Sequence, residues 1–363
     1  MESPVFKERN ELKGLLLSGG TGTRLRPLTY SGPKQLLPVA NKPILFYAIE
    51  NLRQAGITDL GVIVGENARH VKERLKDGHE LGVQISYITQ KQPLGLAHAV
   101  KTASSFLQNQ SFVMILGDTL LDQGICSFVD HYRAVNPVAA VLVSRVKEPE
   151  HYGVVRVENQ RVVQLIEKPK SFISDLALTG IYAFSPRIHE AIESITPSAR
   201  GELEITDALQ WLVTQNEEVI FQIHPGWWKD TGRPADLLEA NRLLLHDQKP
   251  CLEGYADPFT RVTGNVRIER GARITHSTLI GPLVIGRNAH IEDAVIGPYT
   301  TIGHEANIKR AELADSILLD RCQIDGPIRL SRSLIGRETV IHKTKYEAGW
   351  IHLILGDTSR CDL

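Results

Sequence analysis

Short runs of apolar residues alternate with amphipathic stretches from about residue 13 to residue 245. The apolar runs have the length of buried strands, and they are Leu15–Leu17, Gly61–Val64, Ile85–Ile88, Phe112–Leu116 and Ala139–Val143. The stretches between them have helical spacing, and they are Ile44–Gln54, Ala68–Lys76, Ala97–Phe106 and Asp236–Leu245. This alternation predicts an α/β domain with a Rossmann-like, mostly parallel sheet covered by helices on both faces.

A different pattern begins near residue 257, where aliphatic residues recur at every sixth position. The first three triplets start seventeen residues apart and are Val262, Ile268, Ile274; Leu279, Ile285, Ile291; and Ile296, Ile302, Ile308. This spacing predicts a parallel β-helix with three short strands per coil and the aliphatic side chains inside. A β-sandwich, the alternative, would alternate with a period of two. The repeat resembles that of left-handed hexapeptide β-helices, a shape that specifies no chemistry.

These patterns divide the 363 residues into five parts. They are a polar N-terminal extension (1–12), the α/β domain (13–245), a linker (246–256), the hexapeptide repeat (257–345) and a C-terminal tail (346–363). The extension is too polar for a secretory signal.

Composition narrows the possible partners. The net charge of −1 favours neither nucleic acid nor an anionic membrane surface. No apolar run approaches the roughly 20 residues of a membrane-spanning helix. The four cysteines are widely scattered, which is typical of free thiols in a cytoplasmic protein.

A glycine-rich segment follows the first predicted strand. Gly19, Gly20 and Gly22 lack a Cβ atom, so the backbone can turn sharply and its amides can approach an anion. Arg24 and Lys34 add positive charge, and the combination favours a polyphosphate ligand over a plain turn with solvated arginines.

Two common phosphate loops do not fit this segment. A Walker loop has Lys-Ser or Lys-Thr after its last glycine, where this chain has Thr23-Arg24. A dinucleotide fingerprint has a third glycine at the position of Leu25.

Residues 19–43 instead resemble the signature of the sugar-1-phosphate nucleotidylyltransferases. That signature reads G-G-x-G-T-R-L-x-P-x-T, then K-x-L-x-P-V and K-P, and each fixed position is met here. The resemblance extends over nearly the whole chain and is strongest to the long form that acts on glucose 1-phosphate and dTTP. It implies a Mg²⁺-dependent transfer that yields dTDP-glucose and pyrophosphate, in a homo-oligomer. It also implies that Arg24, Lys34 and Lys168 neutralise charge on the reacting phosphates.

The resemblance assigns Asp118 and Asp230 to one Mg²⁺ site. Asp118 follows a predicted buried strand, and carboxylates with phosphate oxygens suit the six-coordinate ion. Taken alone, Asp118 is more typical of a turn or a helix cap, and Asp230 could equally cap the helix that follows Pro234. Thr119 departs from the family, which usually has Asn after the first aspartate.

The sugar is assigned to Gly153, Glu167, Lys168, Leu178 and Gly180. The resemblance implies that Glu167 binds sugar hydroxyls, that Lys168 binds the sugar phosphate, and that the other three offer backbone atoms. A solvated Glu–Lys pair is the alternative. The charged segment 200–207 could bind ligand or begin a helix.

The nucleotide is assigned to the glycine-rich segment and a base-reading region. The residues are Gly19, Gly20, Thr21, Gly22, Thr23, Gln35, Gln90, Pro93, Gly95, Gly117 and Asp118. Leu94 stands where many thymidylyltransferases have Asp, so the contact with the base could differ in detail.

The expected reaction is attack by a sugar-phosphate oxygen on the α-phosphorus of the triphosphate. The attacking phosphate, with a second pKa near ~6, is mostly dianionic at neutral pH and needs no general base. A uridylyltransferase is the alternative within the class, because a pocket separates thymine from uracil by one methyl group. Acetyl transfer by the β-helix is the alternative from another class, and His276, His290, His304 and His342 have no telling context for it. We expect the β-helix to pack on the α/β domain or on a neighbouring subunit and to perform no chemistry itself.

Overall fold

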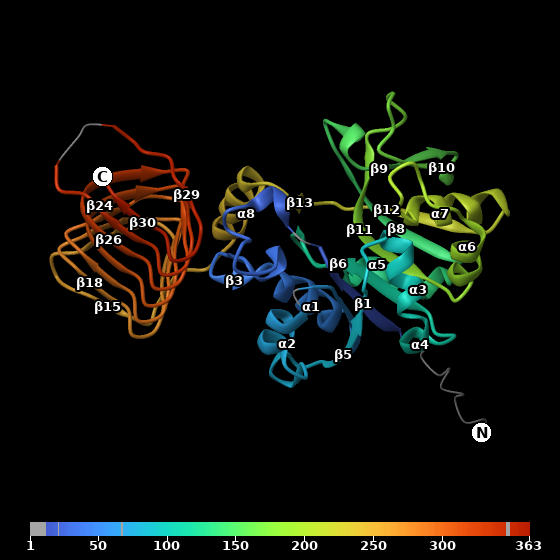
Figure 1. The fold of residues 1–363 in the computed structure, drawn as a ribbon, viewed down its shortest axis with the longest axis horizontal. Coiled ribbons are helices and arrows are strands. Elements are labelled where there is room, and N and C mark those ends of the chain that lie inside the picture. The colour runs from blue at the N-terminus through green and yellow to red at the C-terminus, as the bar shows by residue number, and fades with distance from the viewer. Residues whose placement is uncertain (1–11, 21, 67, 346–348) are drawn as a thin grey trace, which may run out of the picture. The chain divides into compact units, whose positions relative to one another are not determined.

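The computed structural model describes residues 12–20, 22–66, 68–345 and 349–363, and its contacts form two compact units. One unit takes in the residues up to Gly20 together with Leu45–Asp230 (Figure 1). The other takes in Thr21–Ile44 together with Thr231–Leu363. The end of the glycine-rich segment and the last helix before the repeat therefore group with the C-terminal repeat.

A mixed, mainly parallel sheet forms the centre of the first unit. Its strands run in the order β10-β9-β11-β6-β1-β4-β5, and β8 joins β11 to β12. The strands are β1 Lys13–Ser18, β4 Asp59–Val64, β5 Gln84–Thr89, β6 Phe112–Leu116, β8 Ala139–Arg145, β9 Gly153–Glu158, β10 Arg161–Glu167, β11 Leu176–Phe184 and β12 Val219–Ile223. The predicted Rossmann-like core, in which β1 runs parallel to β4 and β6, is confirmed. The antiparallel insertion of β11 beside β6 was not predicted.

Helices lie at the three places predicted for this unit, and others are additional. The helices are α1 Ile44–Gln54, α2 Ala68–Leu75, α3 Leu96–Thr102, α4 Ser104–Leu107, α5 Cys126–Val135, α6 Ile188–Ser194 and α7 Ile205–Thr214. Of these, α5, α6 and α7 were not predicted. The stretch predicted as one helix over residues 97–106 is divided into α3 and α4 at Ala103.

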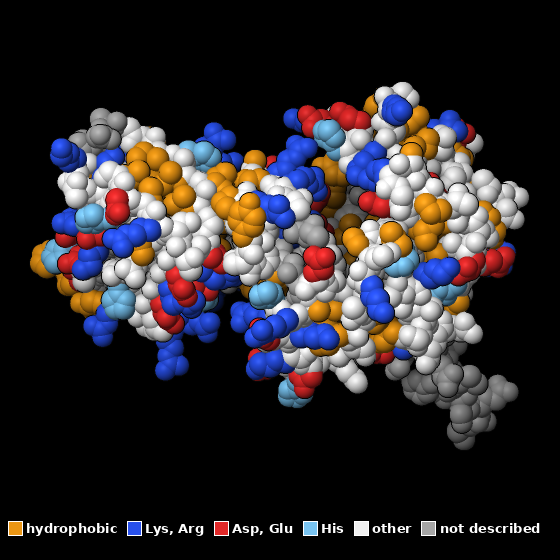
Figure 2. Space-filling model, viewed as in Figure 1, with side chains coloured by type: hydrophobic (Ala, Val, Ile, Leu, Met, Phe, Trp, Pro, Cys, Tyr) orange, Lys and Arg blue, Asp and Glu red, His pale blue; other side chains and the backbone are white. Residues whose placement is uncertain are grey.

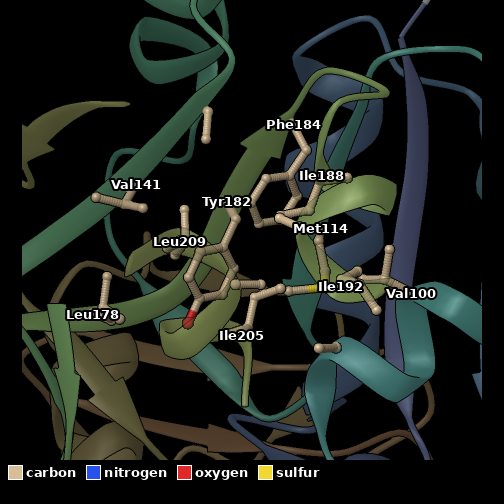
Figure 3. Close-up of a cluster of buried hydrophobic side chains, with 14 of the residues drawn as sticks. Val100, Met114, Val141, Leu178, Tyr182, Phe184, Ile188, Ile192, Ile205 and Leu209 are labelled. Carbon is tan, nitrogen blue, oxygen red and sulfur yellow. The ribbon is translucent and has the colours of Figure 1, made fainter. Parts of the chain in front are cut away.

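Both faces of the sheet are buried. Successive residues of β1 point to opposite faces, and those on each face pack against helices. Leu15 and Leu17 join a core cluster on one face, which α3, α6 and α7 cover with residues such as Val100, Ile192 and Leu209 (Figure 3). A Cβ built on Gly14 would lie 2.4 Å from Leu60 and 3.2 Å from Leu52 of α1, so α1 covers the other face. The sheet thus forms a rigid platform, and the carboxyl ends of β1, β5 and β6 are fixed with it.

The second unit contains the predicted parallel β-helix. One sheet runs β14-β17-β20-β23-β25-β27-β29, and the other connects β15-β18-β21-β24 with β22-β19-β16 and continues through β26 and β28 to β30. Every pairing within these two sheets is parallel. The predicted ladder of Ile268, Ile285 and Ile302 belongs to its buried core.

The strands of the β-helix are short, and β24 and β26 each extend over two of its faces. The bounds are β14 Cys251–Leu252, β15 Tyr255–Ala256, β16 Arg261–Thr263, β17 Val266–Ile268, β18 Arg273–Thr275, β19 Thr278–Ile280, β20 Leu283–Ile285, β21 His290–Glu292, β22 Val295–Ile296, β23 Thr300–Ile302, β24 Asn307–Ala314, β25 Ile317–Leu318, β26 Gln323–Ser331, β27 Leu334–Ile335, β28 Val340–His342, β29 Ile354–Leu355 and β30 Arg360–Asp362. The ladders therefore include strands from the expected linker and from the expected C-terminal tail.

Residues 22–44 and helix α8 (Pro234–His246) pack on one face of this β-helix. The hairpin of β2 (Pro38–Val39) and β3 (Lys42–Pro43) turns through Ala40 and Asn41, both in the left-handed region. The Asn41 side chain donates to the Ile302 carbonyl at 2.8 Å. The outward-facing Val284, Ile317 and Leu334 are buried on this face, although they lie outside the core of the β-helix.

The surface has no strong excess of either charge. Lys and Arg are mixed with Asp and Glu on the face shown in Figure 2, in keeping with the net charge of −1. Among the described helices, none combines the length and the apolar character needed to cross a bilayer.

Candidate active site

A short antiparallel ladder brings the two predicted metal-binding aspartates together. Strand β7 (Thr119–Leu121) pairs with β13 (Trp228–Asp230), and Asp230 lies opposite Thr119. Directly opposite residues have Cα atoms roughly 4.5–5.5 Å apart, so the backbone of Asp230 lies close to that of Asp118. Both aspartates are partly accessible to solvent.

The chemistry of this pair fits Mg²⁺. Carboxylate oxygens are the ligands that the ion prefers, and Mg²⁺ commonly takes one or two carboxylates together with substrate phosphates and water. Within the described part of the chain, no group of three or more His, Cys, Asp or Glu side chains is placed to hold a metal. A site at Asp118 and Asp230 would therefore leave most coordination positions to the substrate and to water.

Thr119 connects this ladder to the predicted sugar segment. Its Oγ1 donates to the Thr179 carbonyl at 3.1 Å, and Trp228 Nε1 donates to the same oxygen at 2.9 Å. Gly180 is held in the left-handed region, where a Cβ atom would lie 2.7 Å from Leu116 and 3.1 Å from Thr119 Oγ1. The departure at Thr119 thus has a structural role, because the hydroxyl fixes the backbone between Leu178 and Gly180.

The predicted sugar-binding residues converge at the ends of β9 and β10. Glu167 lies opposite Gly153 in the antiparallel register. A Cβ on Gly153 would lie 2.9 Å from Glu167 Oε2, 2.9 Å from Leu178 and 2.8 Å from Thr206. Only glycine fits among these three side chains, so the sequence brings Gly153, Glu167 and Leu178 into direct contact.

Lys168 follows Glu167 in a left-handed conformation with φ of 43°. Its amide donates to the Tyr152 carbonyl at 3.0 Å, and this bond turns the chain away from the sheet. The Lys168 side chain is 47% exposed, and its Nζ lies 3.8 Å from Glu167 Oε1. The ammonium is therefore fixed at its base and free to reach an anion at its tip.

The charged segment 200–207, left open by the sequence, lies against Glu167. Arg200 Nη2 donates to Glu204 Oε1 at 2.8 Å and to Glu167 Oε1 at 3.3 Å. The Glu204 side chain is 5% exposed and also accepts from Ser198 Oγ at 2.8 Å. The segment thus begins α7 and also surrounds Glu167, and this second role of Arg200 and Glu204 was missed.

Burial and charge oppose each other at Glu167. Burial raises the pKa of Glu167, and the nearby Glu204 raises it further, while Lys168 and Arg200 lower it. The net effect is a raised pKa, so Glu167 binds a proton more readily than an exposed glutamate does. A sugar hydroxyl that replaces water here would meet a strong acceptor.

The predicted base-reading residues form a second group in this unit. Gln90 follows β5, is 8% exposed, and donates through its main-chain amide to the Val64 carbonyl at 2.9 Å. A Cβ on Gly95 would lie 2.4 Å from the Leu203 carbonyl oxygen, so glycine is required there. Pro93 and Leu94 are exposed, and Gly19 lies beside the Gln90 side chain.

His98 also belongs to this group, although no motif in the sequence pointed to it. Gln90 Nε2 lies 2.8 Å from His98 Nδ1 and 3.4 Å from the Gly95 carbonyl. Burial lowers the pKa of His98, and the charge of Lys101 lowers it further.

The second unit holds the cationic part of the glycine-rich segment. Gly22 has φ of 65°, and a Cβ there would lie 3.0 Å from Lys34 Cβ and 3.1 Å from Thr29 Cγ2. Thr29 Oγ1 donates to the Gly22 carbonyl at 2.8 Å. Two 3₁₀ turns, Thr23–Leu25 and Lys34–Leu36, therefore lie side by side at Gly22.

The side chains on these turns differ in exposure. Thr23 and Arg24 are exposed, whereas Gln35 is 2% exposed and its Oε1 accepts no hydrogen bond from the described residues. A buried amide oxygen of this kind is costly unless a ligand or water satisfies it. Thr21, also predicted to bind the nucleotide, lies outside the described residues.

Comparison with known proteins places this geometry in a family. A family model described as nucleotidyl transferase matches residues 13–247. A glucose-1-phosphate thymidylyltransferase of Streptomyces antibioticus is 44% identical over 354 residues, which cover 97% of this chain and 99% of that protein.

Solved structures agree with this relationship. A Bacillus anthracis protein assigned as a glucose-1-phosphate thymidylyltransferase, in complex with sucrose, is 36% identical. It superposes with a TM-score of 0.62 over 66% of this chain and 96% of its own. A UDP-glucose pyrophosphorylase complexed with UDP-glucose is 28% identical, with a TM-score of 0.59 over 65% of this chain and 99% of its own. The chain belongs to the nucleotidyl transferase family.

Proposed function

We propose that this protein transfers the thymidylyl group of dTTP to glucose 1-phosphate, giving dTDP-glucose and pyrophosphate, with Mg²⁺ as cofactor. The observation that carries the proposal is the shared Thr179 carbonyl. Thr119 and Trp228 of the aspartate ladder both donate to it, beside Leu178 and Gly180 of the sugar segment. An acidic pair and a sugar-binding cluster are thus joined through one backbone group. The named activity of the Streptomyces antibioticus relative, similar over nearly its whole length, supports the choice of substrates.

The reaction requires few protein groups. An oxygen of the sugar phosphate attacks the α-phosphorus of dTTP, a new O–P bond forms, and the bond to the bridging oxygen of pyrophosphate breaks. The attacking phosphate is mostly dianionic above its second pKa of ~6, so no side chain needs to remove a proton. Catalysis then depends on positioning and on neutralising charge.

Three cationic side chains and a metal ion would neutralise the charge on the reacting phosphates. Arg24 and Lys34 would contact the triphosphate, and Lys168 would contact the sugar phosphate, because a flexible ammonium suits a phosphate oxygen. Asp118 and Asp230 would hold Mg²⁺. When bound, this ion neutralises phosphate charge and polarises the phosphoryl oxygens.

The sugar would bind at Glu167. The carboxylate would accept from sugar hydroxyls, and the charges of Lys168 and Arg200 oppose the rise in its pKa that burial causes. Gly153 and Gly180 would let Glu167 and Thr119 pack directly against the backbone beside the sugar, since a side chain at either position would collide with these residues.

Uridylyl transfer is the second candidate, favoured by the similarity to a UDP-glucose pyrophosphorylase. Thymine and uracil differ by one methyl group, worth about 1–3 kcal/mol in a pocket. Steady-state assays with dTTP and UTP, each paired with glucose 1-phosphate and an amino-sugar 1-phosphate, distinguish the two. We expect the highest kcat/KM with dTTP and glucose 1-phosphate. The proposal would be overturned if none of these substrate pairs released pyrophosphate.

We also propose that the enzyme acts in the cytoplasm as an oligomer of identical chains. Val262, Ile280 and Val295 lie on the neighbouring strands β16, β19 and β22 and remain exposed, and such apolar groups favour association. The four cysteines are free thiols, as expected in a reducing compartment. Light scattering and cell fractionation test these two points, and a monomer or a secreted protein would contradict them.

A further inference from the structure

The side-chain amide of Gln90 ends in two atoms, Oε1 and Nε2, which are similar in size but differ in hydrogen bonding. A base-reading amide can present either its oxygen, which accepts a hydrogen bond, or its nitrogen, which donates one. Thymine and uracil carry a donor at N3, whereas cytosine carries an acceptor there. The end of Gln90 that faces the base therefore decides which pyrimidines can pair with it.

The surroundings of Gln90 fix its orientation. Its Nε2 lies 3.4 Å from the Gly95 carbonyl, which can only accept. Its Oε1 points toward Gly19, where it would be 3.4 Å from a Cβ atom. In the flipped orientation, Oε1 would oppose the Gly95 carbonyl, and two acceptors would repel each other.

The contact between Gln90 Nε2 and the Gly95 carbonyl is long for a hydrogen bond, so it holds the amide only weakly. A second acceptor is needed to fix the orientation of the amide. His98 Nδ1, 2.8 Å from Gln90 Nε2, is at the distance of a full hydrogen bond. Since Nε2 can only donate, Nδ1 must be unprotonated, and the ring must carry its proton on Nε2. Burial and the charge of Lys101 lower the pKa of His98, which favours the neutral ring that this hydrogen bond requires.

We propose that His98 is a positioning residue that fixes the amide of Gln90 with its oxygen toward the base, and thereby selects thymine and uracil nucleotides against cytosine nucleotides. This inference rests on the proposed function and on the assignment of Gln90 to the region that reads the pyrimidine base. His98 itself need not touch the substrate. It acts by accepting from Nε2, so that Oε1 alone is left for N3–H.

Three variants test the proposal by steady-state kinetics with dTTP, UTP and dCTP. His98→Leu keeps the size of the side chain but removes the acceptor. His98→Asn places Oδ1 near the position of Nδ1 and should restore it. Thr102→Val is the matched control, because Thr102 Oγ1 donates to the His98 carbonyl at 2.8 Å and has no bond to the ring.

We expect His98→Leu to lower the ratio of kcat/KM for dTTP to that for dCTP by about tenfold or more, the effect of one lost hydrogen bond. The KM for glucose 1-phosphate should stay within about twofold, because His98 forms a hydrogen bond with Gln90 of the base-reading group and with none of the residues assigned to the sugar, all of which the structure describes. His98→Asn should recover most of the ratio, and Thr102→Val should keep the wild-type ratio. An unchanged ratio in His98→Leu would overturn the inference, as would an equal loss in Thr102→Val.

A measurement on the wild-type protein covers the case in which His98→Leu fails to fold. Nitrogen-15 NMR of the His98 ring should show a neutral tautomer with its proton on Nε2, and a proton on Nδ1 would overturn the inference. The proposed function fails separately, when the wild-type enzyme uses neither dTTP nor UTP. Wild-type activity with dTTP and an unchanged ratio in His98→Leu would reject the role of His98 alone.

Discussion

Asp230 lies opposite Thr119 in the antiparallel ladder of β7 and β13, one residue from Asp118. Residues more than a hundred positions apart in the sequence thus meet at the carboxyl end of β6. The first prediction follows from this meeting. Asp118→Asn and Asp230→Asn should each lower kcat by orders of magnitude at saturating Mg²⁺, because an amide neutralises less charge and binds Mg²⁺ weakly.

The control for this prediction lies next to the other end of the same ladder. Asp122 Oδ1 lies 2.8 Å from Nε2 of the buried His224, outside the proposed site. Asp122→Asn makes the same chemical change, and it should lower the melting temperature while kcat stays near that of the wild type. Near-normal turnover in Asp118→Asn at high Mg²⁺ would contradict the metal assignment.

The second prediction concerns Lys168, whose backbone is fixed by Tyr152 while its side chain is half-exposed. Lys168→Ala should raise the KM for glucose 1-phosphate by at least about tenfold, since a charged contact contributes roughly 1.5–3 kcal/mol. The KM for dTTP should change much less. Lys170→Ala, two residues along the chain and also exposed, is the matched control. Equal effects on both substrates would mean that Lys168 contacts the triphosphate or acts structurally.

The third prediction is a pH dependence at Glu167. Because the folded-state pKa of this carboxyl is raised, chiefly by burial, the folded protein binds the proton more tightly than the unfolded chain does. The contribution of Glu167 to stability is therefore greatest below the ordinary glutamate pKa and is lost as the pH rises through the raised value. Glu167→Gln does not titrate, so its melting temperature relative to the wild type should increase from acidic to neutral pH. If the difference in melting temperature between Glu167→Gln and the wild type did not change with pH, the charge on Glu167 would not destabilise the folded protein.

Much of this arrangement could be predicted because it depends on local patterns. The apolar run Phe112–Leu116 and the hexapeptide ladder are short-range signals, and both are confirmed. The role of Arg200 was not predictable, because its guanidinium reaches Glu167 across 33 positions of sequence. The same holds for His98, whose bond to Gln90 depends on how α3 follows β5.

The β-helix was expected to pack on other segments, but which of its faces is covered was not predicted, although the sequence held a signal for this. Just before the inward aliphatic residues on one face of the β-helix stand Val284, Ile317 and Leu334, which are apolar and buried. On another face, the corresponding positions are polar, as Arg273 and His290 illustrate. A face with apolar residues on both sides must be covered by another segment. The sequence thus indicated a covered face, but it could not show that residues 22–44 and α8 cover it.

The fourth prediction concerns that covered face. Asn241 of α8 is 0% exposed and makes three hydrogen bonds. Its Oδ1 accepts from the Ala40 amide at 3.0 Å and from Thr301 Oγ1 at 2.7 Å, and its Nδ2 donates to the Tyr299 carbonyl at 3.0 Å. It therefore holds the β2–β3 hairpin, part of the segment with Arg24 and Lys34, against the β-helix.

We expect Asn241→Ala to lower the melting temperature and also to raise the KM for dTTP, because the hairpin and its neighbouring turns lose a fixed position. The control is Ser277→Ala, which removes a buried hydroxyl that donates to the Thr275 carbonyl at 2.7 Å and accepts from the Ala294 amide at 3.1 Å. Both variants leave buried backbone groups unsatisfied, so both should lose stability. Only Asn241→Ala should change the KM for dTTP.

A chain that ends at Leu245 lacks the whole β-helix. It should lose both stability and turnover, and it should catalyse no reaction that the full-length protein does not catalyse. Two results would show that the β-helix has no part in holding the triphosphate-binding segment. One is a shortened chain with the melting temperature and kcat of the full-length protein. The other is the same KM for dTTP in Asn241→Ala and Ser277→Ala.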